Sequence, residues 1–261
     1  MTRLCTLVSG SSGNAVFLSH NGTRILIDCG ISGRQAEACL CGIGAEPSAI
    51  DYILVTHEHT DHTQGVGVLS RRFDIPVVAS RGTWNGMCIG GIAPKNVRIF
   101  DNNDQMDIGG IGVTPFDIPH DANQPTGYRF DAGGRRLAVA TDIGHISDGV
   151  RAAVSGCDTV LLEANYDADM LENGPYPYHL KNRIRGARGH LCNDDAGEFA
   201  LRLVRDGTKT LLLGHLSKEN NSERAAFATV ANILERGGIR VGTDVQMGVA
   251  PRYHASAVIG L

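Results

Sequence analysis

Thr56-His57-Glu58-His59-Thr60-Asp61-His62 concentrates potential metal ligands directly after a short apolar run. The residues just before it, 52–55, include Ile53 and Val55 and favour a buried strand. Residues 63–73 carry apolar side chains every three or four positions and predict a helix. The ligands therefore lie in a strand-to-helix turn. Because side chains alternate along an extended segment, His57 and His59 can reach one cation, whereas Asp61 and His62 face a second.

Length and composition limit the classes of protein to consider. The chain has 261 residues, of which 42% are hydrophobic and 20% are charged, so it can bury a large core. Its net charge of -4 at pH 7 does not fit a protein that coats nucleic acid through overall basic charge. A polyanionic partner must therefore be bound by a local basic patch.

The cysteine pattern and the hydropathy bear on the compartment. The seven cysteines show neither a disulfide framework nor paired zinc-finger spacing. The sequence contains no signal-peptide core and no apolar segment of membrane-spanning length. No linker or low-complexity segment divides it. We therefore expect a cytoplasmic protein without membrane contact, folded as a single α/β domain over residues 1–261.

Apolar runs alternate with turn signals along the rest of the chain. Short strands are predicted throughout, among them three of an antiparallel meander and two at the end of the sequence: 97–100, 105–108, 112–118, 239–245 and 253–259. Asn193 occupies a capping position for a helix that extends to about residue 205. Asp28 closes the apolar strand that begins at residue 24, and it fits either a helix cap or a support for an active site.

Other potential ligands also lie just beyond the ends of predicted apolar strands. In an α/β sheet such ends converge in a crevice. Two ligand sets result, with Asp142 between them: His57, His59 and His120 for one cation, and Asp61, His62 and His215 for the other. Nitrogen and oxygen ligands suit zinc, manganese or iron, and adjacent cations can share and deprotonate a water. No cysteine is among these ligands, which disfavours a closed structural zinc site.

Residues 166–190 form the only marked concentration of positive charge in the sequence. The segment combines aromatic and basic side chains, among them Lys181, Arg183 and Arg185. Basic runs of this kind are often ordinary solvated surface. If they act together, they form a patch for the phosphates that flank a scissile bond.

The order of these motifs resembles the metallo-β-lactamase superfamily over nearly the whole chain. The matching features are residues 56–62, the single His120, Thr141-Asp142 and Gly214-His215. The resemblance implies a four-layer αββα sandwich of two mixed sheets, with two divalent metal ions at one edge of the sheets. It also makes Asp28 a supporting aspartate rather than a cap.

Further motifs resemble the bacterial YycJ/WalJ family within that superfamily, which implies 5′-to-3′ exonuclease action on DNA. These motifs occupy residues 9–14, 161–167, 174–184, 189–193 and 214–221. Residues 189–193 and Glu163 also resemble the phosphate-side motifs of RNase Z. This resemblance adds Asn193 to the expected substrate-binding residues, and it places Cys192 where both families usually carry a serine, so that a hydroxyl donor is missing.

Residues and resemblance together predict metal-assisted hydrolysis of a phosphodiester, with DNA preferred over RNA. Asp61 is expected to orient the attacking hydroxide and accept its proton. His190, paired with Glu163, is expected to protonate the leaving oxygen. Lys181, Arg183 and Arg185 are expected to hold flanking phosphates.

Three alternatives compete with a DNA hydrolase. RNase Z-like processing of transfer-RNA precursors is disfavoured because the sequence shows no separate Gly/Pro-rich arm for gripping RNA. Hydrolysis of a small thioester, lactone or β-lactam is disfavoured by the basic segment and by the lack of an export signal. A metal-bound regulatory protein without turnover is disfavoured by a full ligand set that leaves a position for water.

Overall fold

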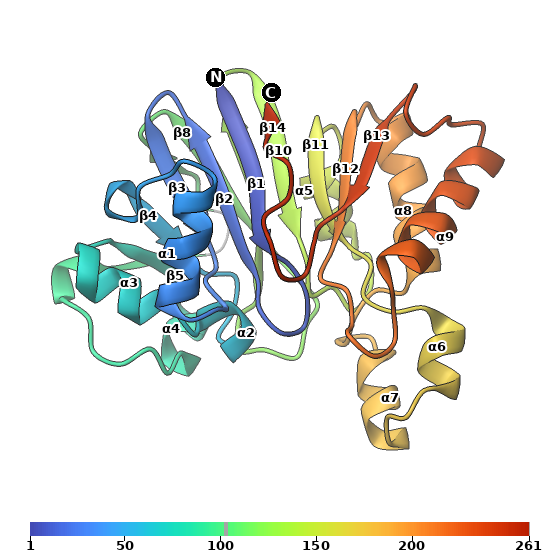
Figure 1. Cartoon of the computed structure of the whole chain (residues 1–261), viewed down its shortest axis with the longest axis horizontal. Coiled ribbons are helices and arrows are strands. Elements are labelled where there is room, and N and C mark those ends of the chain that lie inside the picture. Colours follow the sequence, from blue (N-terminus) through green and yellow to red (C-terminus); the bar gives the residue numbers. More distant parts are fainter. Residues whose placement is uncertain (102–103, 261) are drawn as a thin grey trace.

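The computed structural model describes residues 1–101 and 104–260, and within these ranges the strands form two sheets of seven strands each (Figure 1). In spatial order, the first sheet contains β14 (Ile259–Gly260), β1 (Thr2–Val8), β2 (Ala15–His20), β3 (Thr23–Ile27), β4 (Tyr52–Leu54), β5 (Val77–Ser80) and β6 (Val97–Phe100). The second contains β13 (Gln246–Val249), β12 (Thr210–Gly214), β11 (Thr159–Glu163), β10 (Arg135–Ala140), β9 (Thr126–Ala132), β8 (Ile111–Asp117) and β7 (Met106–Ile108).

Both sheets are mixed, and in the same way. Pairing is antiparallel from β14 to β3 and parallel from β3 to β6 in the first sheet. In the second sheet it is antiparallel from β7 to β10 and parallel from β10 to β13. The carboxyl ends of the parallel strands therefore meet at one edge of the sandwich, the lower edge in Figure 1.

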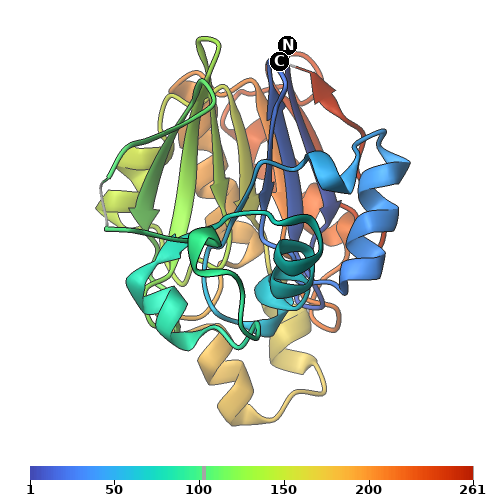
Figure 2. The same ribbon diagram turned by 90° about the vertical axis from the view of Figure 1, so that its left-hand side faces the viewer.

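Helices cover the outer face of each sheet, and short helices gather at the lower edge (Figure 2). The outer helices are α1 (Gly33–Gly42), α3 (Val66–Phe73) and α4 (Arg81–Gly86) on the first sheet, and α5 (Asp148–Val154), α8 (Asn193–Arg205) and α9 (Glu223–Arg236) on the second. The short helices at the edge are α2 (Thr60–Thr63), α6 (Ala168–Asn173) and α7 (Tyr178–Ile184). Two 3-10 turns, at Pro47–Ala49 and Pro94–Asn96, precede β4 and β6.

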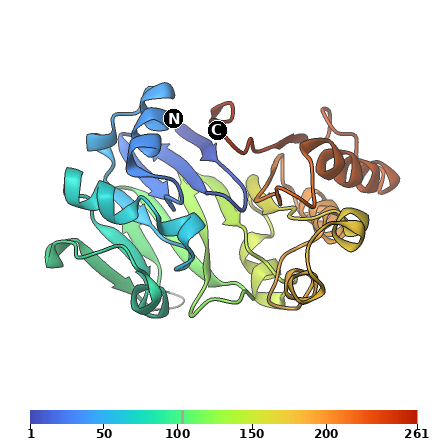
Figure 3. The same cartoon turned by 60° about the horizontal axis from the view of Figure 1, so that its bottom comes forward.

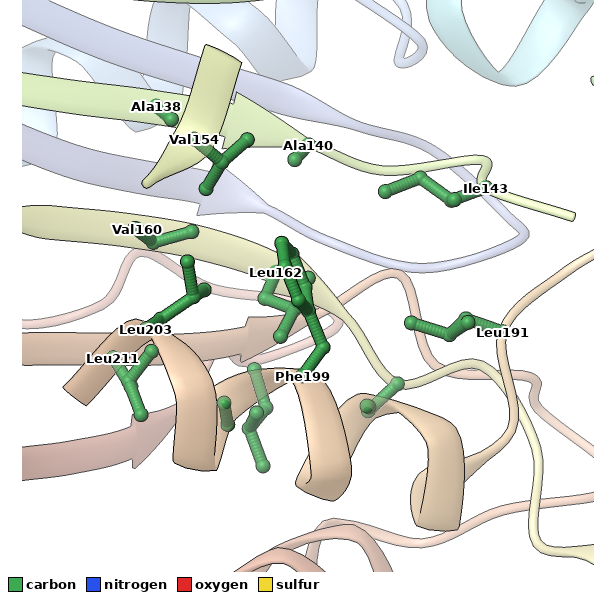
Figure 4. Packing of buried hydrophobic residues seen from close by; sticks show 14 of the residues in the cluster. Ala138, Ala140, Ile143, Val154, Val160, Leu162, Leu191, Phe199, Leu203 and Leu211 are labelled. Carbon is green, nitrogen blue, oxygen red and sulfur yellow. The ribbon is translucent and has the colours of Figure 1, made fainter. Parts of the chain in front are cut away.

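Three apolar interiors separate the four layers. Ile25, Tyr128 and Phe130 are buried between the two sheets. A second interior lies between the first sheet and α1 and α3. The third lies between the second sheet and α5, α8 and α9, where Leu162 and Phe199 meet (Figure 4). Each fully buried side chain of this size stabilises the fold by about 1.5–3 kcal/mol. The four-layer αββα sandwich predicted from the sequence is confirmed.

The helix predicted over residues 63–73 is wrong in its extent, because α2 and α3 are separate helices. Gly65 lies at the break, where the chain passes close to the segment after β3. A side chain there would clash, since a Cβ on Gly65 would lie 2.4 Å from the Ile31 carbonyl oxygen and 2.6 Å from Cys29 Sγ. This close approach fixes the end of α2 against the segment that follows β3.

The predicted strand boundaries near both sheet edges also need correction. Residues 97–100 do not join the meander, because β6 pairs in parallel with β5 in the first sheet. The predicted strand 239–245 is instead a turn, in which Asp244 N–H donates to the Arg240 carbonyl and Asp244 Oδ2 accepts from Arg240 N–H at 2.7 Å. β13 begins only after this turn, and the last strand is reduced to Ile259–Gly260. No helix in residues 1–101 or 104–260 is long and apolar enough to cross a membrane.

Candidate metal centre

The sequence-predicted ligands meet at the lower edge of the sandwich, which turns towards the reader in Figure 3. His57, His59, Asp61 and His62 come from the loop and helix after β4 in the first sheet. His120, Asp142 and His215 come from the ends of β8, β10 and β12 in the second sheet. Both ligand sets therefore draw on both sheets.

Strained backbone marks three of the strand ends that form the centre. Asp28, Asp142 and His215 adopt the left-handed conformation, with φ of 59°, 62° and 53°. This conformation is uncommon for residues other than glycine and costs on the order of 1 kcal/mol or more. Its recurrence at three strand ends shows that the fold holds these side chains in place against local preference.

The first ligand set is His57, His59 and His120, whose ligand atoms all lie within 4.8 Å of one another. His57 Nε2 is 3.0 Å from His59 Nδ1. Two ligands of one tetrahedral zinc, each bound at about 2.0–2.1 Å, are about 3.3 Å apart, so this spacing is suitable for a shared cation. Burial, reinforced by the neighbouring imidazoles, lowers the pKa of His57 well below its usual value. The ring is therefore neutral at pH 7 and has a free lone pair.

The second ligand set is Asp61, His62 and His215. Asp61 Oδ2 is 3.6 Å from His62 Nε2 and 3.5 Å from His215 Nε2. Burial alone would raise the pKa of Asp61, but the His62 and His215 rings hold it well below its usual range. Asp142 lies between the sets, 3.3 Å from His62 Nε2 and 3.8 Å from His120 Nε2. The geometry thus matches both predicted sets and the predicted bridging position.

Neighbouring groups fix the tautomers of the ligand rings. His120 Nδ1 lies 3.1 Å from the Gly189 carbonyl oxygen, which can only accept, so Nδ1 carries the proton. His62 Nδ1 lies 2.8 Å from Asp28 Oδ2, and Asp28 also accepts from the Thr56 N–H and hydroxyl, each at 2.8 Å. In both rings the proton on Nδ1 leaves Nε2 with its lone pair towards the centre, the arrangement common in metal-ligating histidines. Asp28 is therefore a support and not a helix cap.

Several buried atoms at the centre have no hydrogen-bond partner in the described part of the chain. They are His120 Nε2, His215 Nε2 and Asp142 Oδ2. A buried polar atom without a partner costs about 1–3 kcal/mol. All three belong to the ligand sets or to Asp142 between them, and each can coordinate a cation when Nε2 of the rings carries no proton, so divalent cations fit the centre and would satisfy them. The fold and these residues define a divalent-metal centre.

Glu163 links the metal centre to His190. It ends β11 and is fully buried. Its Oε1 lies 2.7 Å from His215 Nδ1 and 2.9 Å from His190 Nδ1, while Oε2 accepts from the backbone N–H of Ile143 and Leu191. Burial alone would raise its pKa, but the neighbouring His190 and His215 rings, which both hydrogen-bond to it, hold the pKa well below the usual range. The carboxylate therefore stays ionised and orients both rings, as the predicted Glu163–His190 pair requires.

The basic segment divides into residues with different partners. Arg183 Nε lies 2.5 Å from Asp121 Oδ2, directly beside the ligand His120. Lys181 donates to the Glu172 carbonyl, and Arg185 pairs with the Glu172 carboxylate at 3.1 Å, so these two join α7 to α6. Of the three predicted phosphate-binding cations, Arg183 is the one held against the centre.

Two contacts here were not predicted as part of the site. Arg188 donates to the carbonyls of His120 and Ala122 at 2.8 and 3.1 Å and so clamps the loop that carries His120. Asn14, at the end of the loop after β1, has its Nδ2 3.1 Å from His62 Nε2. The family-like motif at residues 9–14 could have indicated the contact of Asn14 with His62. No sequence pattern indicates the contact of Arg188 with the loop of His120.

Asn193 and Cys192 differ from the sequence-based expectation. Cys192 is the N-cap of α8, because its Sγ accepts from the Asp195 N–H at 3.4 Å. Asn193 is fully buried, and its side-chain amide pairs with Asn221 at 3.1 and 2.9 Å. It therefore neither caps the helix nor reaches the surface of the site, and we remove it from the proposed substrate-binding residues.

The fold and the metal centre are those of a large hydrolase superfamily, and comparison with known proteins agrees. A family model described as the beta-lactamase superfamily domain matches residues 23–216. YhfI of Bacillus subtilis, a metallo-beta-lactamase fold protein, superposes with a TM-score of 0.74 at 14% identity, covering 98% of this chain and 99% of that one. This likeness shows the fold alone. The chain belongs to the beta-lactamase superfamily.

Closer relatives place the chain within one branch of the superfamily. Exodeoxyribonuclease YycJ of Bacillus anthracis is 39% identical over 256 residues, covering 95% of this chain and 97% of that protein. Exodeoxyribonuclease WalJ of Streptococcus pneumoniae is 38% identical over 245 residues, covering 92% and 91%. Ribonuclease Z of Agathobacter rectalis is a weaker match, 28% identical over 120 residues and 41% of this chain. The chain is therefore a member of the YycJ/WalJ family.

Proposed function

We propose that the chain is a two-metal phosphodiesterase that degrades DNA from the 5′ end. The observation that carries the proposal is the pair of ligand sets at one sheet edge, in which buried ligand atoms without hydrogen-bond partners face one another. Relatives named exodeoxyribonucleases, similar over nearly the whole chain, support DNA as the substrate and exonuclease action. Seven cysteines without a disulfide among the described residues support a reducing compartment such as the cytoplasm.

Two divalent cations, zinc or manganese with iron as a further candidate, would be held by His57, His59 and His120 and by Asp61, His62 and His215, with Asp142 shared. When bound, they supply positive charge for the phosphoryl oxygens and lower the pKa of a water molecule. The mixed nitrogen and oxygen ligands suit each of these metals. The spacing of these side chains supports this ligand set, and elemental analysis of the purified protein identifies the metal.

Asp61 is suited to orient the attacking water and to take its proton. Its side chain is 27% exposed, whereas the other ligands of its set are buried, so it is the ligand that faces the substrate side. The His62 and His215 rings keep its carboxylate ionised at neutral pH. An ionised carboxylate within the ligand set can accept a proton at the oxygen that is not engaged with the rings.

His190 is suited to protonate the leaving oxygen. Its Nδ1 is fixed by Glu163 at 2.9 Å, so the proton that it exchanges with the substrate resides on Nε2. The ring is 20% exposed and lies close to both ligand sets, with ring centroids 5.1 Å from His120 and 5.3 Å from His215. A group in this position can reach a phosphodiester bound at the centre.

Arg183 is the best placed group for a flanking phosphate, and Lys181 and Arg185 extend the positive surface along α7. Arg183 is 58% exposed and already binds the Asp121 carboxylate beside the centre. A phosphate of the substrate can replace that carboxylate, since both anions match the guanidinium in charge and geometry. The segment therefore fits a nucleic acid as partner, with DNA preferred and RNA as the alternative.

The test is hydrolysis of DNA labelled at either end, with manganese or zinc titrated into the chelator-treated protein. We expect labelled mononucleotides to appear at once from 5′-labelled strands and a ladder of shortened products from 3′-labelled strands. His59→Ala should lower the bound metal and the turnover by orders of magnitude. The exposed His179→Ala is the matched control and should behave as wild type.

Three outcomes would contradict the proposal. Cleavage of a transfer-RNA precursor without cleavage of DNA would indicate an RNase Z-like activity. Hydrolysis of a small thioester or lactone alone would indicate a small-molecule hydrolase on the same scaffold. Metal uptake without hydrolysis of any of these substrates would indicate a regulatory protein.

A further inference from the structure

The loop at residues 9–14, between β1 and β2, contacts the metal centre on one side and a second feature on the other. Ser9 Oγ accepts from the His215 N–H at 2.9 Å, which ties the loop to the second ligand set. Ser9 N–H donates to the Pro251 carbonyl at 3.1 Å, which ties it to the segment between β13 and β14. Figure 1 shows this red segment beside the blue loop. The loop at residues 9–14 therefore connects the segment at residues 251–253 directly to the ligand His215.

Arg252, in that segment, carries a positive charge that forms no ion pair within residues 1–101 and 104–260. Its guanidinium lies against Gly10, where a Cβ would come within 2.5 Å of Nη1. Nη2 donates to the Leu216 carbonyl at 2.6 Å, but Nη1 is buried and forms no hydrogen bond in the described part of the chain. Glu219 and Glu223 interact with Arg252 electrostatically, but neither forms an ion pair with it in the described part of the chain. A partly buried guanidinium without an ion-pair partner is suited to bind an anion through its exposed part.

A pocket of about 250 Å³ adjoins Arg252 and has two kinds of lining. Val8, Ile31 and Ala38 form an apolar wall, and the exposed Ser12 shares the rim with Arg252. Tyr253, which is 69% exposed, forms a further wall. An apolar recess with an aromatic side and a cationic rim matches a nucleotide, whose base is flat and apolar on its faces and whose phosphate is anionic.

We propose that this pocket is a subsite for one nucleotide of the DNA strand. Arg252 and Ser12 bind its phosphate, and its base enters the apolar recess beside Tyr253. The subsite rests on the proposed DNA hydrolase function and adds a position to it, next to the second ligand set.

Arg252→Gln, Ser12→Ala and Ala38→Phe test the subsite. Kinetics are measured on single-stranded DNA and on bis(p-nitrophenyl) phosphate, a diester too small to use the pocket, and deoxyadenosine monophosphate is added as a competitor. Ala38 is exposed, so a phenylalanine there fills the recess without disturbing a core. Arg240→Gln is the matched control for charge, because Arg240 pairs with Asp244 in an exposed turn away from the pocket.

We expect Arg252→Gln to raise the KM for DNA about 10- to 100-fold, because a charge-assisted hydrogen bond to phosphate is lost. Ala38→Phe should also raise the KM for DNA, and both variants should weaken inhibition by the nucleotide. Ser12→Ala should have a smaller effect of the same kind, whereas Arg240→Gln should match wild type. Losses on the small diester should be much smaller than losses on DNA.

Equal losses on DNA and on the small diester for Arg252→Gln, with Ala38→Phe unaffected, would show that Arg252 only supports the His215 loop. Unchanged DNA kinetics in all three variants would overturn the subsite and leave the proposed function standing. If the wild type cleaves neither DNA nor the diester, the proposed function fails. Calorimetric binding of deoxyadenosine monophosphate to the wild type and to Ala38→Phe then decides the subsite separately, since equal or absent binding would overturn it.

Discussion

Replacing Glu163 by glutamine tests how far the metal centre depends on one buried carboxylate. Glu163 receives four hydrogen bonds, two from His190 and His215 on Oε1 and two from backbone N–H groups on Oε2. The glutamine side chain keeps the shape, but one of its two terminal atoms is a donor. That donor must face either the two backbone N–H groups or the two imidazoles.

Both arrangements of the glutamine are costly. Facing the backbone leaves two buried N–H groups without an acceptor, at about 1–3 kcal/mol each, so the free energy of unfolding falls by about 2–6 kcal/mol. Facing the rings forces the proton of His215 from Nδ1 to Nε2, which removes the lone pair that points to the second ligand set. We therefore expect lower stability, fewer than two metal ions per chain, or both, together with a large loss of turnover.

The assay for Glu163→Gln combines urea unfolding of the metal-free protein with elemental analysis of the metal-loaded protein. Glu46→Gln is the control, because Glu46 is exposed and its replacement should change stability by less than about 0.5 kcal/mol. Wild-type stability together with wild-type metal content in Glu163→Gln would refute the argument, since it would mean that the four hydrogen bonds do not fix the ring tautomers.

Three further predictions follow from individual contacts. Cys192→Ser should raise the free energy of unfolding by about 0.5–1 kcal/mol, because a hydroxyl is a better N-cap acceptor than the thiol; urea unfolding measures this, and a decrease would contradict it. Arg183→Ala should raise the KM for single-stranded DNA and reduce the slope of log binding constant against log salt concentration by about 0.7. Lys181→Ala should have a smaller effect, because Lys181 donates to the Glu172 carbonyl within the α6–α7 segment. Equal effects of the two substitutions would count against this assignment. His59→Ala should lower the metal content, measured by elemental analysis, and full retention of two ions would remove His59 from the ligand set.

The ligand positions could be predicted because their signal is local. Parallel strands bring their carboxyl ends together, so the position of His57 and His215 just after apolar strands places both in one crevice. His120 follows β8, which pairs antiparallel with β7 and β9 but runs in the same direction as β10. The sandwich followed from the resemblance of the motifs to a known superfamily. A shift of one or two residues in a strand boundary leaves each ligand at the same edge of the sheet.

The surroundings of the ligands could not be predicted, because they depend on contacts between distant segments. Arg188 clamps the loop of His120 from 68 residues away, and Ser9 reaches the backbone of His215 across 206 residues. The sequence predicts Asn193 as the N-cap of α8, whereas the structure has Cys192 at that position. Asparagine is a favoured N-cap residue, but the Asn193 side chain is buried and hydrogen-bonds to Asn221 instead. Short helices such as α6 and α7 have weak intrinsic signals and exist through tertiary packing.

The placement of the ligands on both sheets has a consequence for folding. Each ligand set takes members from the first and the second sheet, so a bound cation acts as a noncovalent cross-link between the two halves of the chain. Its binding free energy then adds to the docking of the sheets, by about 4 kcal/mol when the free metal exceeds the dissociation constant a thousandfold. The thermal stability of the whole sandwich therefore depends on the concentration of free metal, although only one edge of the molecule touches the ions.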